Sequence, residues 1–139
     1  MHLRKATPDD AAAIDAVNCF SGDRLGAIKQ GRCVTAIIDE QVAGFVVYHQ
    51  AGLIGKPFVE YLVVAPSFHR RGIGMALLRA VENELRPCRL FISTQADNTP
   101  MLSLLSEQDW KRAGRIDQIN NSGEAELFFF RDIAADPNG

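Results

Sequence analysis

The strongest constraint on the fold is a junction, in the middle of the chain, between an apolar run and a helical pattern. The run from Phe58 to Val64 is apolar at nearly every position and ends at Ala65-Pro66, as expected of a strand in the centre of a sheet. Apolar residues then recur at three- and four-residue steps from Ile73 to Leu85, which predicts an amphipathic helix. The sequence therefore predicts a strand, a short loop and a helix in direct succession.

The residues that join this strand to the helix have the composition of an anion site. We call them the glycine loop, residues 69–74, and their sequence is His69-Arg70-Arg71-Gly72-Ile73-Gly74. Glycines at a helix start leave the first backbone N–H groups accessible, and the positive end of the helix dipole favours an anion there. The two arginines add positive charge. The alternative to an anion site is a purely structural role, because glycines also let a helix and a strand pack closely.

Two common phosphate-binding motifs do not fit the glycine loop. A P-loop requires Gly-Lys followed by Ser or Thr, and the chain has no such sequence. A dinucleotide-binding fingerprint requires a third glycine three residues after Gly74, where the chain has Leu77. That fold also turns directly from strand to helix, without the residues that precede Gly72 here. Asp97 lies at the distance of a ribose-binding acid, and we interpret this spacing as coincidence.

The rest of the chain alternates between β-branched runs and helical patterns. The predicted strands cover residues 3–6, 32–38, 42–48, 58–64, 88–93, 115–119 and 127–130, and further helices are expected after Thr7-Pro8 and Asn98-Thr99-Pro100. Thr7 and Thr99 are the expected N-caps. Residues 21–31 are weakly patterned and predict a short helix or an irregular loop, and residues 51–55 predict a glycine-rich connection. Gly44 inside a strand indicates a bulge or the close approach of another backbone.

The glycine loop and its setting resemble the coenzyme A binding region of the GNAT superfamily of N-acetyltransferases. The family pattern is Gln or Arg, two variable residues, Gly, one variable residue, then Gly or Ala, and it falls on residues 69–74. Residues 61–68 are similar to the family's fourth strand and turn, and the predicted order of elements is similar to the family's over nearly the whole chain. His69 departs from the Gln or Arg of the first position, which should weaken one side-chain contact without removing the site.

The resemblance implies an α/β GNAT fold, a mixed, mostly antiparallel central sheet of about seven strands flanked by about four helices. The length of the chain predicts a single domain, over residues 1–133, and the last residues, 134–139, predict a disordered tail. The resemblance also implies acetyl-CoA as a cosubstrate, wedged between the fourth and fifth strands, and no metal. The oligomeric state is left open, and the resemblance is compatible with a homodimer.

The resemblance also implies which residues bind the coenzyme. The family uses mainly backbone N–H groups of the loop on the pyrophosphate, and the backbones of Leu62 and Val64 would bond the pantetheine arm. The amide near Leu62 would polarise the thioester carbonyl. Asn98 matches a family asparagine that contacts the coenzyme, although a turn or helix-start role also fits it. The implied coenzyme-binding residues are Leu62, Val63, Val64, His69, Arg70, Arg71, Gly72, Ile73, Gly74, Met75 and Asn98.

Acetyl transfer to an amine needs a base, because an alkyl ammonium is mostly charged at neutral pH. Glu60 is the only charged residue between Phe58 and Pro66, and strand alternation places it with Leu62 and Val64. Burial among apolar neighbours raises the pKa of a carboxyl group, which suits a base. A glutamate at the corresponding position is a proposed base in the polyamine acetyltransferase branch of the family. Glu60 is therefore the candidate general base, and the alternative is a solvated or ion-paired carboxylate.

The general acid is missing from its family position. Many family members carry a tyrosine at the end of an Asn-x-x-Ala-x-x-Leu-Tyr pattern, and Leu105 occupies that place here and cannot donate a proton. Ser103, Ser106, Tyr61 or water could replace it. This absence keeps open a second function, a coenzyme A or acyl-coenzyme A binding module without turnover. A nucleotide-binding regulatory domain is a third reading.

The acceptor is not specified by any motif. Its pocket would be built from residues 21–31 and the closing hairpin. His49 and Glu126, at the ends of their strands, are further polar candidates for the acceptor cleft, and each also fits a surface or turn role. The sequence therefore predicts an N-acetyltransferase that moves the acetyl group of acetyl-CoA to a primary amine by direct transfer in a ternary complex.

Composition and charge exclude several other classes of protein. The 139 residues are enough for one domain with a core, and the net charge of -2 argues against a nucleic-acid partner. No apolar run reaches the about 18 residues of a membrane span, and the first residues lack the apolar core of a signal peptide, so we expect a cytoplasmic protein without a membrane partner. Cys19, Cys33 and Cys88 are scattered, which fits reduced thiols better than disulfides or a zinc site and leaves a catalytic thiol open.

Overall fold

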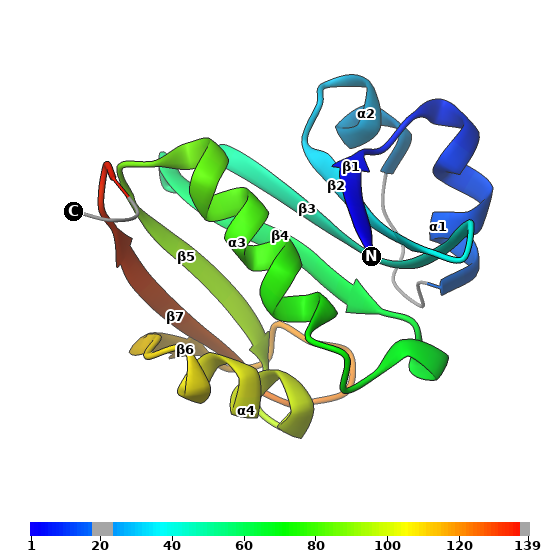
Figure 1. Cartoon of the computed structure of the whole chain (residues 1–139). Helices are drawn as coiled ribbons and strands as arrows, with labels where there is room; N and C mark the ends of the chain where they lie inside the picture. Colours follow the sequence, from blue (N-terminus) through cyan, green and yellow to red (C-terminus); the bar gives the residue numbers. More distant parts are fainter. Residues whose placement is uncertain (18–23, 137–139) are drawn as a thin grey trace. The chain divides into compact units, whose positions relative to one another are not determined.

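The computed structural model describes residues 1–17 and 24–136, and within these ranges seven strands form one sheet in the order β1-β2-β3-β4-β5-β7-β6. The elements in chain order are β1 (His2–Lys5), η1 (Pro8–Asp10), α1 (Ala11–Val17), α2 (Arg24–Lys29), β2 (Cys33–Ile38), β3 (Gln41–Leu53), β4 (Lys56–Val64), η2 (Pro66–Phe68), α3 (Ile73–Leu85), β5 (Cys88–Gln95), α4 (Thr99–Glu107), β6 (Lys111–Ile116) and β7 (Glu126–Ile133) (Figure 1). None of the helices in the described ranges is long and apolar enough to span a membrane.

The predicted α/β fold with a mixed, mostly antiparallel sheet is confirmed. β4 pairs with β5 in parallel, whereas β1–β2, β2–β3, β5–β7 and β6–β7 are antiparallel. The chain divides into two compact units, one made of Met1–His49 and Glu60–Glu84 and the other of Gln50–Val59 and Leu85–Gly139. β3 and β4 each begin in one unit and end in the other.

The core of the first unit lies between its N-terminal helices and its strands. Figure 1 shows α1 and α2 beside β1 and β2. The buried cluster consists of Ala6, Ile14, Ala27, Ile28, Cys33, Phe45 and Val47. Burying one large apolar side chain contributes about 1.5–3 kcal/mol, so the short helices are held by packing rather than by their own propensity.

An ion pair holds the start of this unit together. Thr7 is the N-cap of η1, as predicted, and its backbone N–H donates to Asp10 at 2.7 Å. Arg4 of β1 donates two hydrogen bonds to the same carboxylate, at 2.6 and 2.9 Å. These bonds lower the pKa of Asp10 to about 2. The carboxylate therefore stays charged at neutral pH and ties β1 to the helical segment that follows it.

A second polar cluster anchors the C-terminal end of α3. Lys5 donates to Glu84 at 2.6 Å and to the carbonyl of Gly31 at 2.5 Å. The hydroxyl of Tyr48, at the end of the buried part of β3, donates to the same glutamate. Burial and this hydrogen bond raise the pKa of Tyr48. The helix that follows the glycine loop is thereby fixed to β1 and β3.

Gly44 lies both at a bulge and close to another backbone, the two features predicted for it. It lies opposite Ala36, and the β2–β3 register shifts between Ala36 and Ile37, which is a bulge. A Cβ at Gly44 would lie only 2.7 Å from the carbonyl oxygen of Val63 and 3.3 Å from the Cα of Val64. Only glycine fits here, because the obstructing atoms belong to the backbone of β4 rather than to a movable side chain.

The second unit is built on β5, β7 and β6. β5 pairs with β7 continuously from Cys88–Ile133 to Gln95–Glu126. The aromatic run of β7 packs on its neighbours, with ring centroids 6.4 Å apart for Phe58 and Phe128 and 6.1 Å apart for Phe91 and Phe130. These contacts fit the predicted role of the run in hairpin packing.

Several predicted boundaries differ from the structure. β3 continues through the predicted 51–55 connection to Leu53, and the chain turns at Ile54 and Gly55, which both have positive φ. The N-cap of α4 is Asn98 rather than Thr99, because the Asn98 side chain accepts from the N–H of Met101 at 3.3 Å. β6 covers Lys111–Ile116 rather than 115–119. Every residue of this strand is exposed, so it has no apolar pattern that could reveal it.

Candidate active site

The glycine loop leads directly into α3. Gly72 has φ +73° and Arg70 has φ +66°, so the backbone turns twice through the left-handed region. The first turn of α3 closes with a bond from Ala76 N–H to the carbonyl of Gly72 at 3.1 Å. By helix geometry, the N–H groups of Ile73, Gly74 and Met75 precede that donor and have no partner within the helix.

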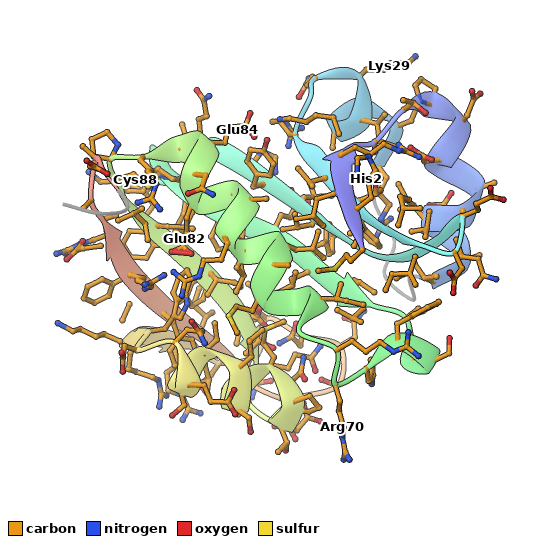
Figure 2. All side chains as sticks on the ribbon, in the orientation of Figure 1. His2, Lys29, Arg70, Glu82, Glu84 and Cys88 are labelled. Atoms are coloured by element: carbon orange, nitrogen blue, oxygen red, sulfur yellow. The ribbon has the colours of Figure 1, made fainter. Side chains whose placement is uncertain are left out.

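Space and charge at this helix start fit an anionic group. Apart from Gly72 itself and its two chain neighbours, no described residue has a heavy atom within 4 Å of the place where a Cβ of Gly72 would be. Arg70 and Arg71 are exposed, and Figure 2 shows the Arg70 side chain pointing away from the ribbon. The guanidinium of Arg71 lies 5.3 Å from the ring centroid of Phe68. Accessible N–H groups and two exposed cations suit a pyrophosphate.

His69 attaches the glycine loop to the end of β4. Its Nε2 lies 2.9 Å from the carbonyl oxygen of Val64. A carbonyl only accepts, so Nε2 is the donor. The residue that departs from the family pattern thus contacts one of the residues expected to bind the pantetheine arm. The sequence did not indicate this contact, because it depends on how the turn after β4 folds back.

The predicted pantetheine-binding strand is partly buried. Leu62, Val63 and Val64 all have intermediate exposure, and the side chain of Val63 packs against the core cluster of the first unit. In the described register β4 pairs with β5 at Phe58 and Val59, and no later β4 residue has a β5 partner. The last residues of β4 therefore do not pair with β5 in this register.

Asn98 lies in the second unit, at the start of α4. Its side-chain oxygen accepts from the backbone N–H of Met101, which is the helix-start role considered for it. A contact with the coenzyme stays a prediction for this residue.

Glu60 lines a cavity of about 220 Å³ in the first unit, which we call the Glu60 cavity. Its wall comes from α2 and the residue after it, from Arg32 before β2, and from β3 and β4. The lining residues are Arg24, Gly26, Ala27, Gln30, Arg32, Val47, His49, Glu60 and Tyr61. The weakly patterned segment 21–31 therefore contributes to this wall.

Within the cavity wall, Glu60 is hydrogen-bonded to His49. The bond joins His49 Nε2 to Glu60 Oε2, and because a carboxylate only accepts, Nε2 carries the proton. The side chain of Glu60 is 38% exposed and that of His49 is 31% exposed. Glu60 is thus a half-solvated, hydrogen-bonded carboxylate. Its prediction as a general base assumed burial among apolar residues, and this burial is only partial.

Arg32 also contacts the His49 imidazole. Its Nη1 is 3.0 Å from Nδ1 and 3.2 Å from Nε2 of the imidazole, and it donates to the carbonyl of Tyr48 at 3.1 Å. With the proton on Nε2, Nδ1 is the nitrogen that can accept from the guanidinium. Arg32, His49 and Glu60 therefore form a continuous polar chain along the cavity.

The other predicted polar candidates lie elsewhere. Leu105 is fully buried in α4, and Ser103 and Ser106 are exposed on the same helix, in the second unit. Glu126 accepts from Ser93 at 2.7 Å and from Asn120 at 3.1 Å, which is a turn role.

Cys33 does not suit catalysis. Cys33 is buried in the core, and burial raises the pKa of its thiol to about 11. It is therefore protonated and inert at neutral pH. Cys88 is half-buried and forms no disulfide, and Cys19 lies outside the described residues.

The sequence did not single out Arg24. This residue is only 6% exposed, and its guanidinium carbon lies 4.8 Å from the ring centroid of Tyr61, beside Glu60. The sequence shows only that Arg24 is a charged residue in a weakly patterned segment, which does not indicate that it lines a cavity.

Comparison with known proteins agrees with this geometry. A family model described as the acetyltransferase (GNAT) family matches residues 8–110, which include the glycine loop and the Glu60 cavity. A comparison with curated protein sequences gives no match.

Several solved structures share the fold. A GNAT-family acetyltransferase from Bacillus cereus ATCC 10987 is 25% identical with a TM-score of 0.81, covering 94% of this chain and 96% of that one. The ribosomal-protein-S18-alanine N-acetyltransferase of Escherichia coli is 20% identical with a TM-score of 0.78, and the match covers 99% of this chain and 97% of that one. An acetyltransferase of Salmonella typhimurium, solved with acetyl-CoA, is 15% identical with a TM-score of 0.78, and the match covers 96% of this chain and 94% of that one. The chain belongs to the GNAT family of acetyltransferases.

Proposed function

We propose that this protein transfers the acetyl group of acetyl-CoA to a primary amine that enters the Glu60 cavity, directly and within a ternary complex. The observation that supports it best is the pairing of Glu60 with His49 in the wall of a cavity. The same unit contains the glycine loop. Structural neighbours named as acetyltransferases, one of them solved with acetyl-CoA, support the cosubstrate.

The glycine loop has the binding role in this proposal. Acetyl-CoA supplies an acetyl group activated as a thioester. The N–H groups of Ile73, Gly74 and Met75 would hold its pyrophosphate, with Arg70 and Arg71 adding charge. The backbone of Leu62 and Val64 would bond the pantetheine arm, with Val63 between them, and Asn98 would be a further coenzyme contact.

Glu60 has the chemical role. It would take a proton from the acceptor ammonium, directly or through one water, so that the neutral nitrogen can form the new C–N bond as the C–S bond breaks. The Nε2–H of His49 orients the carboxylate, and Arg32 in turn positions His49. Leu105 cannot protonate the leaving thiolate, so we propose solvent water for that step.

Thiol release tests the transfer. The protein should release free coenzyme A thiol from acetyl-CoA at a rate that depends on an added amine and is unchanged by excess EDTA. Peptides, polyamines, amino acids and aminoglycosides form the test panel. A rate that needs a metal ion, or one that ignores the amine, would contradict the proposal.

The fully buried Leu105 at the acid position favours a second function, binding of acetyl-CoA without turnover. A thermal shift separates the two. Saturating acetyl-CoA should raise Tm by mass action, while ATP and NAD should not. A shift without thiol release from any amine would establish the binding module instead.

A further inference from the structure

We propose that Lys5 and Tyr48 are positioning residues for the Glu60 cavity, because together they fix the conformation of Arg32. Neither is among the described residues that line the cavity, and both belong to the same unit as the cavity. The inference rests on the proposed function and adds two residues outside the cavity on which the orientation of His49 and Glu60 depends.

The Tyr48 hydroxyl lies at the centre of a polar cluster. Tyr48 is only 2% exposed, and its hydroxyl accepts from Lys5 Nζ at 2.5 Å and donates to Glu84. Lys5 Nζ also donates to both oxygens of Glu84, at 2.6 and 2.8 Å, near the C-terminal end of α3 (Figure 2). A buried hydroxyl without partners is costly, so these bonds fix both the Tyr48 ring and the Lys5 ammonium.

From this cluster, Lys5 reaches the backbone directly before Arg32. Its Nζ donates to the carbonyl of Gly31 at 2.5 Å. That carbonyl shares a peptide group with the N–H of Arg32, which donates to the carbonyl of Ala27 at 2.9 Å. Gly31 has φ +72°, so the chain turns through the left-handed region at this point. The peptide group that enters Arg32 is therefore held at its oxygen and at its nitrogen.

The backbone of Tyr48 holds the rest of Arg32. The N–H of Tyr48 donates to the Arg32 carbonyl at 3.1 Å, and Arg32 Nη1 donates to the Tyr48 carbonyl at 3.1 Å. Arg32 Nε donates to Gln30 at 2.7 Å. These bonds restrain both the backbone and the guanidinium of Arg32, and they place Nη1 3.0 Å from Nδ1 of His49.

The orientation of Arg32 in turn decides the tautomer of His49. A guanidinium only donates, so Nδ1 accepts from Arg32 only while the imidazole proton is on Nε2. The Nε2–H is the group that donates to Glu60. If Arg32 moved away, Nδ1 would lose its donor and both tautomers would become populated. Part of the molecules would then lack the bond that orients the Glu60 carboxylate.

Two substitutions outside the cavity test this inference. Lys5→Met removes the hydrogen bonds of the ammonium but keeps a side chain of similar length, and Tyr48→Phe removes the hydroxyl but keeps the ring. Each should lower kcat for the amine acceptor about tenfold and leave the Kd for acetyl-CoA unchanged, because small displacements of a catalytic group have large effects on rate. Lys5→Arg, which keeps a cation, should retain most of the wild-type kcat.

The His49 imidazole reports the same effect without turnover. NMR spectra of isotope-labelled histidine side chains distinguish the two tautomers, and the His49 signals are assigned by their absence in His49→Ala. At a pH where the imidazole is neutral, the wild type should show His49 as the Nε2–H tautomer. In Lys5→Met and Tyr48→Phe the nitrogen shifts should move toward those of a tautomer mixture.

Asp10→Asn is the control for a loss of stability alone. It breaks the ion pair with Arg4 in the same unit, so it should lower Tm while keeping kcat and the His49 signals. Thermal unfolding shows whether each variant is folded. Tyr48→Phe decides the question if Lys5→Met does not fold, because it keeps the buried ring.

Wild-type kcat together with wild-type His49 signals in the folded variants would overturn the inference. Weaker binding of acetyl-CoA with unchanged His49 signals would also overturn it, because the cluster would then only anchor α3. If no amine supports thiol release, the proposed function fails. The His49 signals alone then decide whether Lys5 and Tyr48 position the imidazole.

Discussion

Replacing Glu60 with Gln should lower kcat/KM for the amine acceptor about 100-fold or more and leave the Kd for acetyl-CoA unchanged. Glutamine keeps the shape of the side chain and an oxygen that accepts from His49, but it cannot take a proton from the acceptor. The dependence of the thiol-release rate on pH should also differ between the wild type and Glu60→Gln.

The control for this substitution is Glu40→Gln, at an exposed position in the turn between β2 and β3. It makes the same chemical change away from the Glu60 cavity and should retain the wild-type rate. The kcat/KM of His49→Ala should lie between the values of Glu60→Gln and Glu40→Gln, because this substitution leaves the carboxylate in place but removes the N–H that orients it. Wild-type rate and pH profile in Glu60→Gln would remove Glu60 from the mechanism.

Replacing Gly44 with Ala should destabilise the protein by about 1–3 kcal/mol or more. The new Cβ would lie 2.7 Å from the Val63 carbonyl oxygen, so either β3 or β4 must move. The same displacement would disturb the end of β4, to which His69 attaches the glycine loop, and acetyl-CoA affinity should fall as well. Urea unfolding gives the free energy of unfolding of both proteins.

Gly114 provides the matched control for Gly44. Apart from Gly114 itself and its two chain neighbours, no described residue has a heavy atom within 4 Å of its Cβ position, and its φ is not in the left-handed region. Gly114→Ala should therefore be neutral or stabilise by up to about 1 kcal/mol. Equal free energies of unfolding for Gly44→Ala and the wild type would show that the approach of the two backbones is not tight.

The centre of the fold was predictable because its signals are local. The apolar run of β4, the proline after it and the helical period of α3 each lie within a few residues, and α3 begins and ends at the predicted Ile73 and Leu85. β6 was misplaced because backbone pairing with β7 holds it, and its exposed side chains follow no apolar period. Pairing of this kind leaves no trace in a single strand's composition.

The candidate site was predictable only in part, for a related reason. Glu60 stands out as one charge within an apolar strand. Its partners do not, because His49 and Arg32 reach it only after β3, β4 and the segment before β2 come together. Arg24 belongs to a helix that is itself short and weakly patterned. The binding motif is contiguous in sequence, whereas the acceptor cavity is assembled by the fold.

The measurement that tests the account most directly is calorimetric titration of acetyl-CoA into the wild type and two charge-reversed proteins. Arg70→Glu with Arg71→Glu changes the exposed cations of the glycine loop, and Lys111→Glu with Arg112→Glu makes the same change in net charge on exposed residues of β6. The wild type and the β6 variant should bind acetyl-CoA with similar Kd. The loop variant should bind at least about tenfold more weakly at low salt, and the difference should shrink as salt screens the charges. No binding to the wild type, or equal binding by both variants, would contradict the assignment of the glycine loop as the pyrophosphate site.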